Sequence, residues 1–178
     1  NGGDLPSHLN EATQAAVRAT AEEAGRALGV VTGNIKGDLV VSDGKPYVIE
    51  LAARASGGYF CTREIPLNTG VDFIGAIIRI ALGEPLNPAD LVPQRQTPVV
   101  QRYAFPRPGK VISITGEDDA RRIPGIEEVA VTVQIGDMIP EPTHSGCTAA
   151  MVLATGASVA QARATAQAAL NALRIETV

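Results

Sequence analysis

Two acidic residues flank a hairpin signal in the first third of the chain. Asp38 and Glu50 lie on either side of the turn dipeptide Asp43-Gly44, which predicts that they occupy neighbouring antiparallel strands. Side chains alternate between the two faces of a strand, so the register decides whether the acids meet. A strict two-residue loop would pair Asp38 with Ile49, whereas the loop Asp43-Gly44-Lys45 with a bulge would pair it with Glu50. We predict the odd-length loop.

Opposed acids of this kind could hold a metal ion. The Cβ atoms of directly opposed residues lie roughly 4.5–5.5 Å apart, which is close enough for both carboxylates to bind one or two cations. Two carboxylates so close repel each other unless a cation neutralises them. Mg²⁺ is commonly held by one or two carboxylates, with water and substrate phosphates completing its shell. Asp38 and Glu50 are therefore the candidate ligands for Mg²⁺ or Mn²⁺.

Groups that suit a phosphate follow the second acid. Arg54 carries a planar guanidinium that can contact a phosphate or acyl-phosphate oxygen with two hydrogen bonds. Ser56-Gly57-Gly58 offers backbone N–H groups in a turn that an anion can approach closely. Together with the acids, these residues could hold a magnesium-bound triphosphate beside a second substrate.

An ordinary structural interpretation stands beside this one. Acids are common on surface hairpins, and Asp-Gly turns occur in many proteins. Glu50 argues against it, because this acid follows Tyr47-Val48-Ile49 and precedes Leu51-Ala52-Ala53 in an otherwise apolar strand. Acids are seldom buried unless they are paired or bound to a metal. The residues alone leave both interpretations open.

The composition is that of a globular protein of one or two domains. The chain has 178 residues, 45% of them hydrophobic, and a net charge of −4, which argues against nucleic acid as a partner. No apolar run is long enough for a membrane span, and no signal pattern opens the chain. Cys61 and Cys147 lack metal-type spacing, so we expect two reduced, buried thiols and a cytoplasmic protein.

The pattern of residues predicts an α+β fold in two parts. Prolines and polar residues between 87 and 98 indicate a boundary, which we place between domains 1–93 and 94–178. The expected helices cover 9–28, ended by Gly29, then 71–82, a turn at 118–122, and a final helix that opens at Ser158 with Gln161 as a capping box. The expected strands are 30–32, 37–41, 46–51, 111–115, 129–135 and 149–154. A stripe of Val159, Ala162, Ala166, Ala169, Leu170 and Leu173 is expected to face a core, with a subunit contact as the alternative.

The first part resembles the C-terminal half of an ATP-grasp domain, an antiparallel sheet with helices. The resemblance rests on the spacing of Asp38 and Glu50, on "YVIELAARASGG", and on "NTGVDFIGAIIRIALGEPL", which occur in this order. It implies that Asp38 and Glu50 ligate magnesium, that Arg54 contacts the transferred phosphate, and that Val40 lies against the adenine of ATP. Gly57 and Gly58 would border the acceptor site, with Ser56 beside them. The resemblance implies small-molecule carboxylate and amine substrates.

One position departs from the family pattern. Many members have Asn two residues after the second acid as a further metal ligand, and this chain has Ala52.

The second part of the chain, with "FPRPGKVISITGEDDARRIPGIEEV" and "GDMIPEPTHSG", resembles the small α+β C-terminal domain of L-amino-acid ligases. The combined resemblance implies an ADP-forming carboxylate–amine ligase. A non-catalytic scaffold or oligomerisation module and an acid–thiol ligase of the same superfamily remain alternatives.

The start of the chain, Asn1-Gly2-Gly3-Asp4, suggests a fragment or a cleaved product, with an expression scar or a processed terminus as the alternative. The only lysines are Lys36, Lys45 and Lys110, and none lies in a glycine-rich phosphate loop. We therefore expect that the N-terminal, ATP-binding half is missing and that the chain alone is inactive. A surface once covered by that half should be apolar, so we also expect a homo-oligomer.

Overall fold

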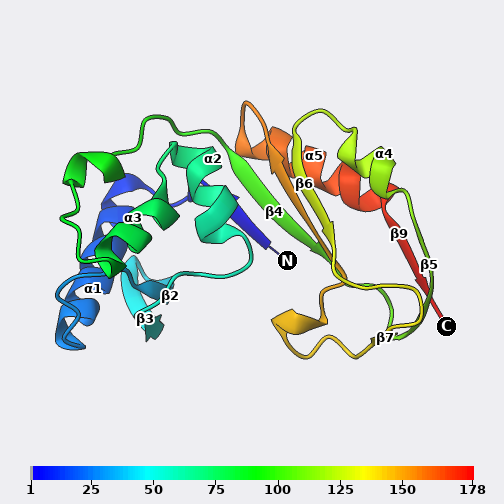
Figure 1. Cartoon of the computed structure of the whole chain (residues 1–178), viewed down its shortest axis with the longest axis horizontal. Coiled ribbons are helices and arrows are strands. Elements are labelled where there is room, and N and C mark those ends of the chain that lie inside the picture. The colour runs from blue at the N-terminus through cyan, green and yellow to red at the C-terminus, as the bar shows by residue number, and fades with distance from the viewer. Residues whose placement is uncertain (1) are drawn as a thin grey trace. The chain divides into compact units, whose positions relative to one another are not determined.

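The computed structural model describes residues 2–178, and Asn1 lies outside the described residues. It confirms the α+β class, with helices and antiparallel sheets (Figure 1). Residues divide into two compact units: Ser7–Arg95 form one, and Gln96–Val178 together with the first residues up to Pro6 form the other. The assignment of 1–93 to an ATP-grasp domain and of 94–178 to a small C-terminal domain stays a prediction.

The unit Ser7–Arg95 contains one hairpin and several helices. Its elements are α1 (Glu11–Ala27), β2 (Lys36–Ser42), β3 (Lys45–Ala52), η1 (Phe60–Glu64), α2 (Ile65–Thr69), α3 (Phe73–Ala81) and η2 (Pro88–Leu91). Helix α1 begins where Asn10 Oδ1 accepts a hydrogen bond from Thr13 N at 2.9 Å, and the left-handed Gly29, with φ 79°, follows its end. The strand predicted for 30–32 is wrong. Val31 is 96% exposed and pairs with no strand of the described chain.

The hairpin has the predicted pairing of Asp38 with Glu50, but the feature that produces this pairing is not the predicted one. Ser42 pairs with Lys45, so the loop is the strict two-residue turn Asp43-Gly44, with φ of 51° and 74°. The predicted three-residue loop is wrong. Leu39 pairs with Val48 and Asp38 with Glu50, so Ile49 is the extra residue of a β-bulge. The two acids are therefore direct cross-strand partners, as predicted.

The bulge also decides which side chains share a face of the hairpin. Cross-strand partners point to the same side, and residues two apart on β2 do as well. Gly37, Leu39 and Leu51 share one face, because a Cβ built on Gly37 would lie 2.8 Å from Leu39 Cδ1 and 3.0 Å from Leu51 Cδ1. Helix α1 packs against this hairpin (Figure 1). The opposite face carries the acids.

The other unit is built on two antiparallel sheets. One has the order β1 (Gly2–Leu5), β4 (Val99–Ala104), β8 (Ala150–Thr155) and β6 (Ile126–Val131), and the other has the order β7 (Met138–Ile139), β5 (Gly109–Thr115) and β9 (Arg174–Thr177). The helices are α4 (Glu117–Arg121), η3 (Ser145–Cys147) and α5 (Val159–Ala172). Helix α5 packs on β4 and β8, and α4 packs on α5 and β6. Strands β1, β4, β7 and β9 are absent from the sequence prediction.

Helix α5 covers the larger sheet as its alanine stripe predicts. Ser158 Oγ accepts from Gln161 N at 3.1 Å, which confirms the predicted cap, while Gln161 Oε1 accepts from Ala157 N at 2.9 Å. Ala162, Ala166 and Ala169 are fully buried in a core with Val100, Val129 and Val152. The stripe therefore packs in the core of its own unit. Small side chains allow the helix to approach the sheet closely.

Two further expectations concern the cysteines and the membrane. Cys61 and Cys147 are buried and free, as predicted. Within residues 2–178, no helix combines the length and apolar character that crossing a membrane requires.

Candidate functional site

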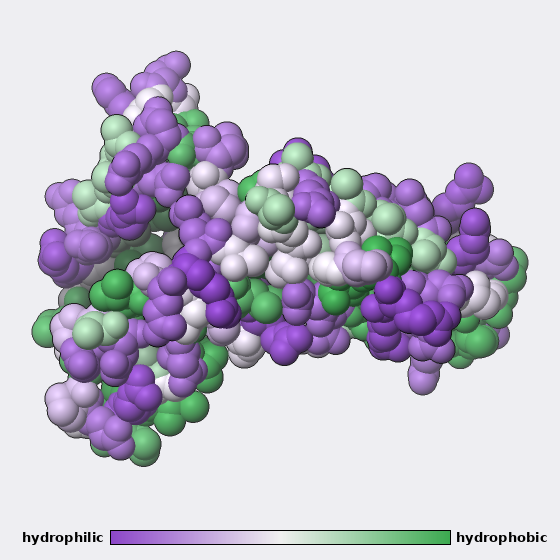
Figure 2. Space-filling model, turned by 90° about the horizontal axis from the view of Figure 1, so that it is seen from above, coloured by the Kyte–Doolittle hydropathy of each residue, from purple (hydrophilic) through white to green (hydrophobic). Residues whose placement is uncertain are grey.

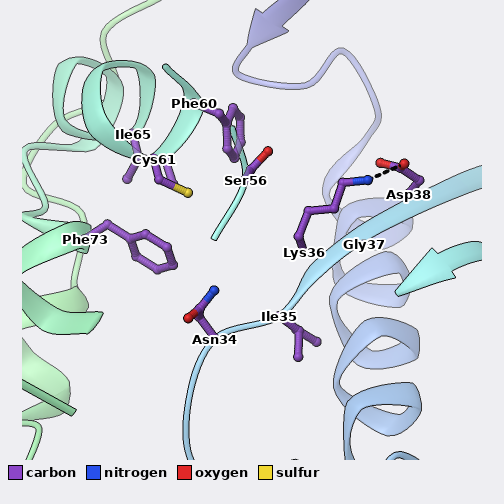
Figure 3. A pocket seen from close by; sticks show the side chains of 10 residues that line it. All are labelled: Asn34, Ile35, Lys36, Gly37, Asp38, Ser56, Phe60, Cys61, Ile65 and Phe73. Atoms are coloured by element: carbon purple, nitrogen blue, oxygen red, sulfur yellow. Dashed lines mark hydrogen bonds and ion pairs between the residues drawn. The ribbon is translucent and has the colours of Figure 1, made fainter. Parts of the chain in front are cut away.

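The open face of the hairpin β2–β3 carries a cluster of three charged groups. Lys36 and Asp38 lie two apart on β2, and Glu50 is the cross-strand partner of Asp38. The Lys36 ammonium forms an ion pair with Asp38 Oδ2, and its Nζ lies 3.6 Å from Glu50 Oε1. Figure 3 shows the lysine side chain reaching Asp38 along the strand. The two carboxylates therefore already share one cation.

The exposure of this cluster corrects one step of the sequence argument. The side chain of Glu50 is 57% exposed and that of Asp38 is 56% exposed, whereas Lys36 is only 20% exposed. Glu50 is thus not a buried acid in an apolar strand, because the bulge places it on the face opposite α1. Its functional interpretation depends on its pairing with Asp38, not on burial.

The acids fit a metal ion as a pair but not as a complete ligand set. The shared lysine ammonium shows that both carboxylates can approach one positive charge. Ala52, which stands where many family members have a metal-binding Asn, is the cross-strand partner of Lys36. The missing ligand position therefore lies next to the lysine. Among residues 2–178, no group of three or more His, Cys, Asp or Glu side chains could hold a metal. Water and phosphate oxygens would have to complete the shell.

An apolar pair continues the same face beyond the acids. Val40 follows Asp38 by two positions and pairs with Tyr47, so both side chains lie on the face of the acids. Val40 is 49% exposed and Tyr47 is 51% exposed. The sequence alternation without a bulge would put Tyr47 and Glu50 on opposite faces. Tyr47 is therefore a candidate that sequence reasoning missed.

The loop after β3 carries the predicted phosphate-binding residues. Arg54 is exposed, and its Nη1 donates to the carbonyl of its neighbour Ala55 at 3.1 Å. A Cβ added to Gly57 would meet nothing within 4 Å, so this backbone is open to a ligand. Gly58 and Tyr59 are both left-handed, with φ of 64° and 68°. A left-handed tyrosine is strained, and such strain is concentrated at functional sites.

A helix with π-type hydrogen bonds follows this loop directly. Helix η1 buries Cys61 and Glu64, and Glu64 is only 2% exposed. Burial raises the pKa of the Glu64 carboxyl to about 7. Short π segments often occur at functional sites. No sequence signal predicted this helix, because Glu64 lies in the polar stretch Thr62-Arg63-Glu64.

A cavity of about 300 Å³ lies beside the acids within the same unit. Lys36, Asp38 and Ser56 line one part of it, and Phe60 and Phe73 line another. Figure 3 shows these residues around a common space, with β2 on one side and the helices η1, α2 and α3 on the other. The structure therefore brings Asp38 and Ser56, two predicted site residues, to one cavity.

The fold is that of the ATP-grasp ligases. Over 98% of its length the chain is similar to the crystal structure of L-amino acid ligase from Bacillus licheniformis, with a TM-score of 0.82 and 25% identity. It also matches phosphoribosylglycinamide synthetase from Anaerococcus prevotii (TM-score 0.83, 17% identity, 99% of this chain) and N5-carboxyaminoimidazole ribonucleotide synthetase from Thermotoga maritima (TM-score 0.72, 17% identity, 98% of this chain). The last two show the fold alone.

The second half of the chain gives the narrower match. Residues 102–178 match the family model L-amino acid ligase C-terminal domain 2. These matches confirm the recognition from the sequence: the chain resembles the C-terminal portion of an ATP-grasp carboxylate–amine ligase of the L-amino-acid ligase kind. The chain spans 43% of the Bacillus licheniformis ligase and 45% of each of the other two. Among curated proteins, the comparison found no match.

Proposed function

We propose that this chain contributes the metal-binding part of the active site of an ATP-dependent, ADP-forming carboxylate–amine ligase. The observation that carries the proposal is the direct cross-strand pairing of Asp38 with Glu50 around one cation, the Lys36 ammonium. The similarity to an L-amino acid ligase favours an amino acid as the amine. Cytoplasm, where ATP is available, is the compartment we propose.

The proposed reaction has two steps. An oxygen of the substrate carboxylate attacks the terminal phosphorus of ATP, and the bond from that phosphorus to the bridging oxygen breaks. The products of this step are an acyl phosphate and ADP. The nitrogen of an unprotonated amine then attacks the acyl carbon. A C–N bond forms, the C–O bond to phosphate breaks, phosphate leaves, and the proton of the nitrogen passes to solvent.

Each residue of the site has a part in this scheme. Asp38 and Glu50 would hold Mg²⁺ or Mn²⁺, which when bound neutralises charge on phosphate oxygens. Arg54 would bind the transferred phosphate with its planar guanidinium, opposing the charge that develops there. Val40 would lie against the adenine, and Tyr47, on the same face, would widen that apolar surface. Ser56, Gly57 and Gly58 would border the acceptor.

The chain alone is proposed to lack turnover. It spans less than half of the ligases it resembles, and the groups that hold the triphosphate from the other side would have to come from a further segment. ADP release in the presence of ATP, Mg²⁺ and an amino-acid mixture measures this directly. Release that is abolished by Glu50→Gln would show that the 178 residues suffice.

A non-catalytic scaffold is the second candidate, and two observations favour it. The Lys36 ammonium already offsets part of the charge of both acids, and Ala52 removes a ligand position. In that case the acids would be a structural ion cluster. The chain would then bind neither metal nor nucleotide. An acid–thiol ligase would share the first step and differ only in the nucleophile.

Calorimetric titration with Mn²⁺ separates these candidates. We expect binding that Glu50→Gln weakens at least about tenfold, because one of the two carboxylates is lost. Glu176→Gln is the matched control, since Glu176 is an exposed strand acid whose cross-strand partner is Ser113. Binding that is unchanged in Glu50→Gln, or no binding with and without ADP, would contradict the assignment of this metal site.

A further inference from the structure

We propose that the cavity beside β2 binds a carboxylic acid with an aromatic-sized apolar group, and that this acid is the substrate whose carboxylate is activated. The inference rests on the proposed function for the reaction, but its binding test is independent of it. Neither the family match nor the similar structures say what the carboxylate substrate of this chain is.

The size and lining of the cavity suit one small molecule with an apolar end. Its volume of about 300 Å³ is at the lower limit for small-molecule pockets, which fits a single amino-acid-sized ligand. Four apolar side chains line one part: Phe60 and Cys61 of η1, Ile65 of α2 and Phe73 of α3. Two rings offer a flat apolar group offset or edge contacts. This part therefore selects an aromatic or large aliphatic group.

The polar part of the cavity contains an unused hydrogen-bond donor. The Nδ2 atom of Asn34 is buried and has no hydrogen-bond partner among the described residues. In Figure 3 its side-chain amide points into the space between Phe73, Ser56 and Lys36. A buried amide without a partner is unfavourable, and an oxygen of a bound ligand would satisfy it. A carboxylate or carbonyl oxygen of a ligand in the cavity would thus accept a hydrogen bond from Asn34 Nδ2.

The charge next to Asn34 makes a carboxylate the better choice. Lys36, an ammonium, lines the same cavity, as does Asp38 of the proposed metal pair. A ligand carboxylate held by Asn34 and attracted by Lys36 would lie beside Asp38. That is where a carboxylate must lie if a phosphoryl group held at the metal is to reach it. The apolar end would then point toward Phe60 and Phe73.

Calorimetry with a simple probe tests the assignment on the 178-residue chain. The probe is 3-phenylpropionate, with 3-phenylpropanol as the analogue without the carboxylate and acetate as the analogue without the ring. We expect 3-phenylpropionate to bind at least about tenfold more tightly than either analogue, since each lacks one half of the recognition. Asn34→Asp replaces the donor by a repelling oxygen at nearly constant shape and should weaken the probe at least about tenfold.

The matched control is Asn171→Asp on helix α5, an exposed residue that lies in the other unit. It makes the same chemical change and should leave the affinity for 3-phenylpropionate unaltered. Equal weakening by Asn34→Asp and Asn171→Asp would overturn the proposal, as would equal affinity for all three compounds or no binding of any of them.

Protection of a cavity thiol gives a second readout. In a Cys147→Ser background, Cys61 is the only thiol and lines the cavity. Saturating 3-phenylpropionate should slow its alkylation by iodoacetamide several-fold, and acetate should not. An unchanged rate would place the probe elsewhere and refute the site. Mn²⁺ binding that depends on Glu50 without any protection of Cys61 would leave the proposed function standing and reject this inference alone.

Discussion

Lys36 is the residue on which the interpretation of the hairpin depends. Its ammonium contacts both acids, so it occupies the position of charge that a metal would take. A bound divalent ion and Lys36 compete for the same carboxylates, and they repel each other. In the absence of a metal, the lysine thus offsets part of the repulsion between the two carboxylates. Metal binding must displace it toward the neighbouring cavity or solvent.

Replacing this lysine should strengthen metal binding. Lys36→Met keeps the aliphatic stem and removes the competing charge, and we expect Mn²⁺ affinity to rise about tenfold. Calorimetric titration measures the change, and Lys45→Met at the turn end of the same hairpin is the control. If Lys36→Met lowers the affinity while Lys45→Met does not, the lysine assists binding and the competition argument is wrong.

Glu64 should make the stability of the chain depend on pH. Its pKa is raised by burial from 4.5 to about 7, so the folded state holds a proton that the unfolded state releases between these values. The free energy of unfolding should therefore fall as the pH rises from about 4.5 to about 7 and then level off. The loss is on the order of 3 kcal/mol. Urea denaturation at a series of pH values measures it.

Glu64→Gln isolates this contribution. Glutamine keeps the shape and carries no charge, so the difference in the free energy of unfolding from the unmodified chain should be smallest below about pH 4.5 and largest above about pH 7. Glu84→Gln, at an exposed position, provides the background from the other carboxylates. A pH dependence that is the same in both variants and in the unmodified chain would show that Glu64 keeps an ordinary pKa.

At the scale of elements, the β-bulge at Ile49 determines the open face of the hairpin. The two-residue turn aligns Val40 with Tyr47 and Leu39 with Val48. Without an extra residue, Asp38 would then face Ile49. The bulge absorbs Ile49 and restores the pairing of Asp38 with Glu50. It thus puts two acids and two apolar residues on one face, and this combination suits a nucleotide with its metal.

Deletions test this reading of the bulge. Removing Ile49 leaves Leu39 opposite Val48 and Asp38 opposite Glu50 in a regular ladder, so Mn²⁺ affinity should stay within about threefold. Removing Leu39 instead shifts Asp38 opposite Val48 and should weaken Mn²⁺ at least about tenfold. Circular dichroism checks that both variants are folded. Loss of binding in a folded chain without Ile49 would mean that the bulge itself shapes the site.

At the scale of the whole molecule, the chain exposes several large apolar side chains. On the hairpin these are Val40, Tyr47, Val48 and Ile49, which are between 38% and 67% exposed. Figure 2 shows hydrophobic residues at the surface between hydrophilic ones on the face in view. Val40 and Tyr47 lie together on one face of the hairpin, and exposed apolar groups that lie together mark interaction surfaces. The resemblance to longer ligases is consistent with a surface that another segment or a second copy covers.

Self-association is therefore the outcome we expect for the isolated chain. Sedimentation velocity should show a larger fraction of dimer as the concentration rises. Ile49→Lys should reduce that fraction, because a charge on an apolar contact is costly to bury. Ile135→Lys, at an equally exposed apolar residue in the other unit, is the control. A chain that stays monomeric at high concentration would contradict the prediction.

The sequence by itself determined the parts whose signals are local. These are the hairpin around Asp43-Gly44, though not its loop length, the Ser158 cap with Gln161, the left-handed Gly29 and the alanine stripe of α5. Each depends on neighbours within a few positions. For the same reason the two acids could be placed on paired strands. The motifs around them were also sufficient to recognise the ATP-grasp class.

Only the tertiary structure decided what depends on distant partners. Strand β1 pairs with β4 and is held by Asp4, which binds Arg102 at 2.7 Å and Arg163 at 2.5 Å. The bulge at Ile49, the exposure of Glu50, the lysine between the acids and the burial of Glu64 likewise follow from packing. Register and burial are set by which surfaces meet, and residue order along one strand does not contain that information.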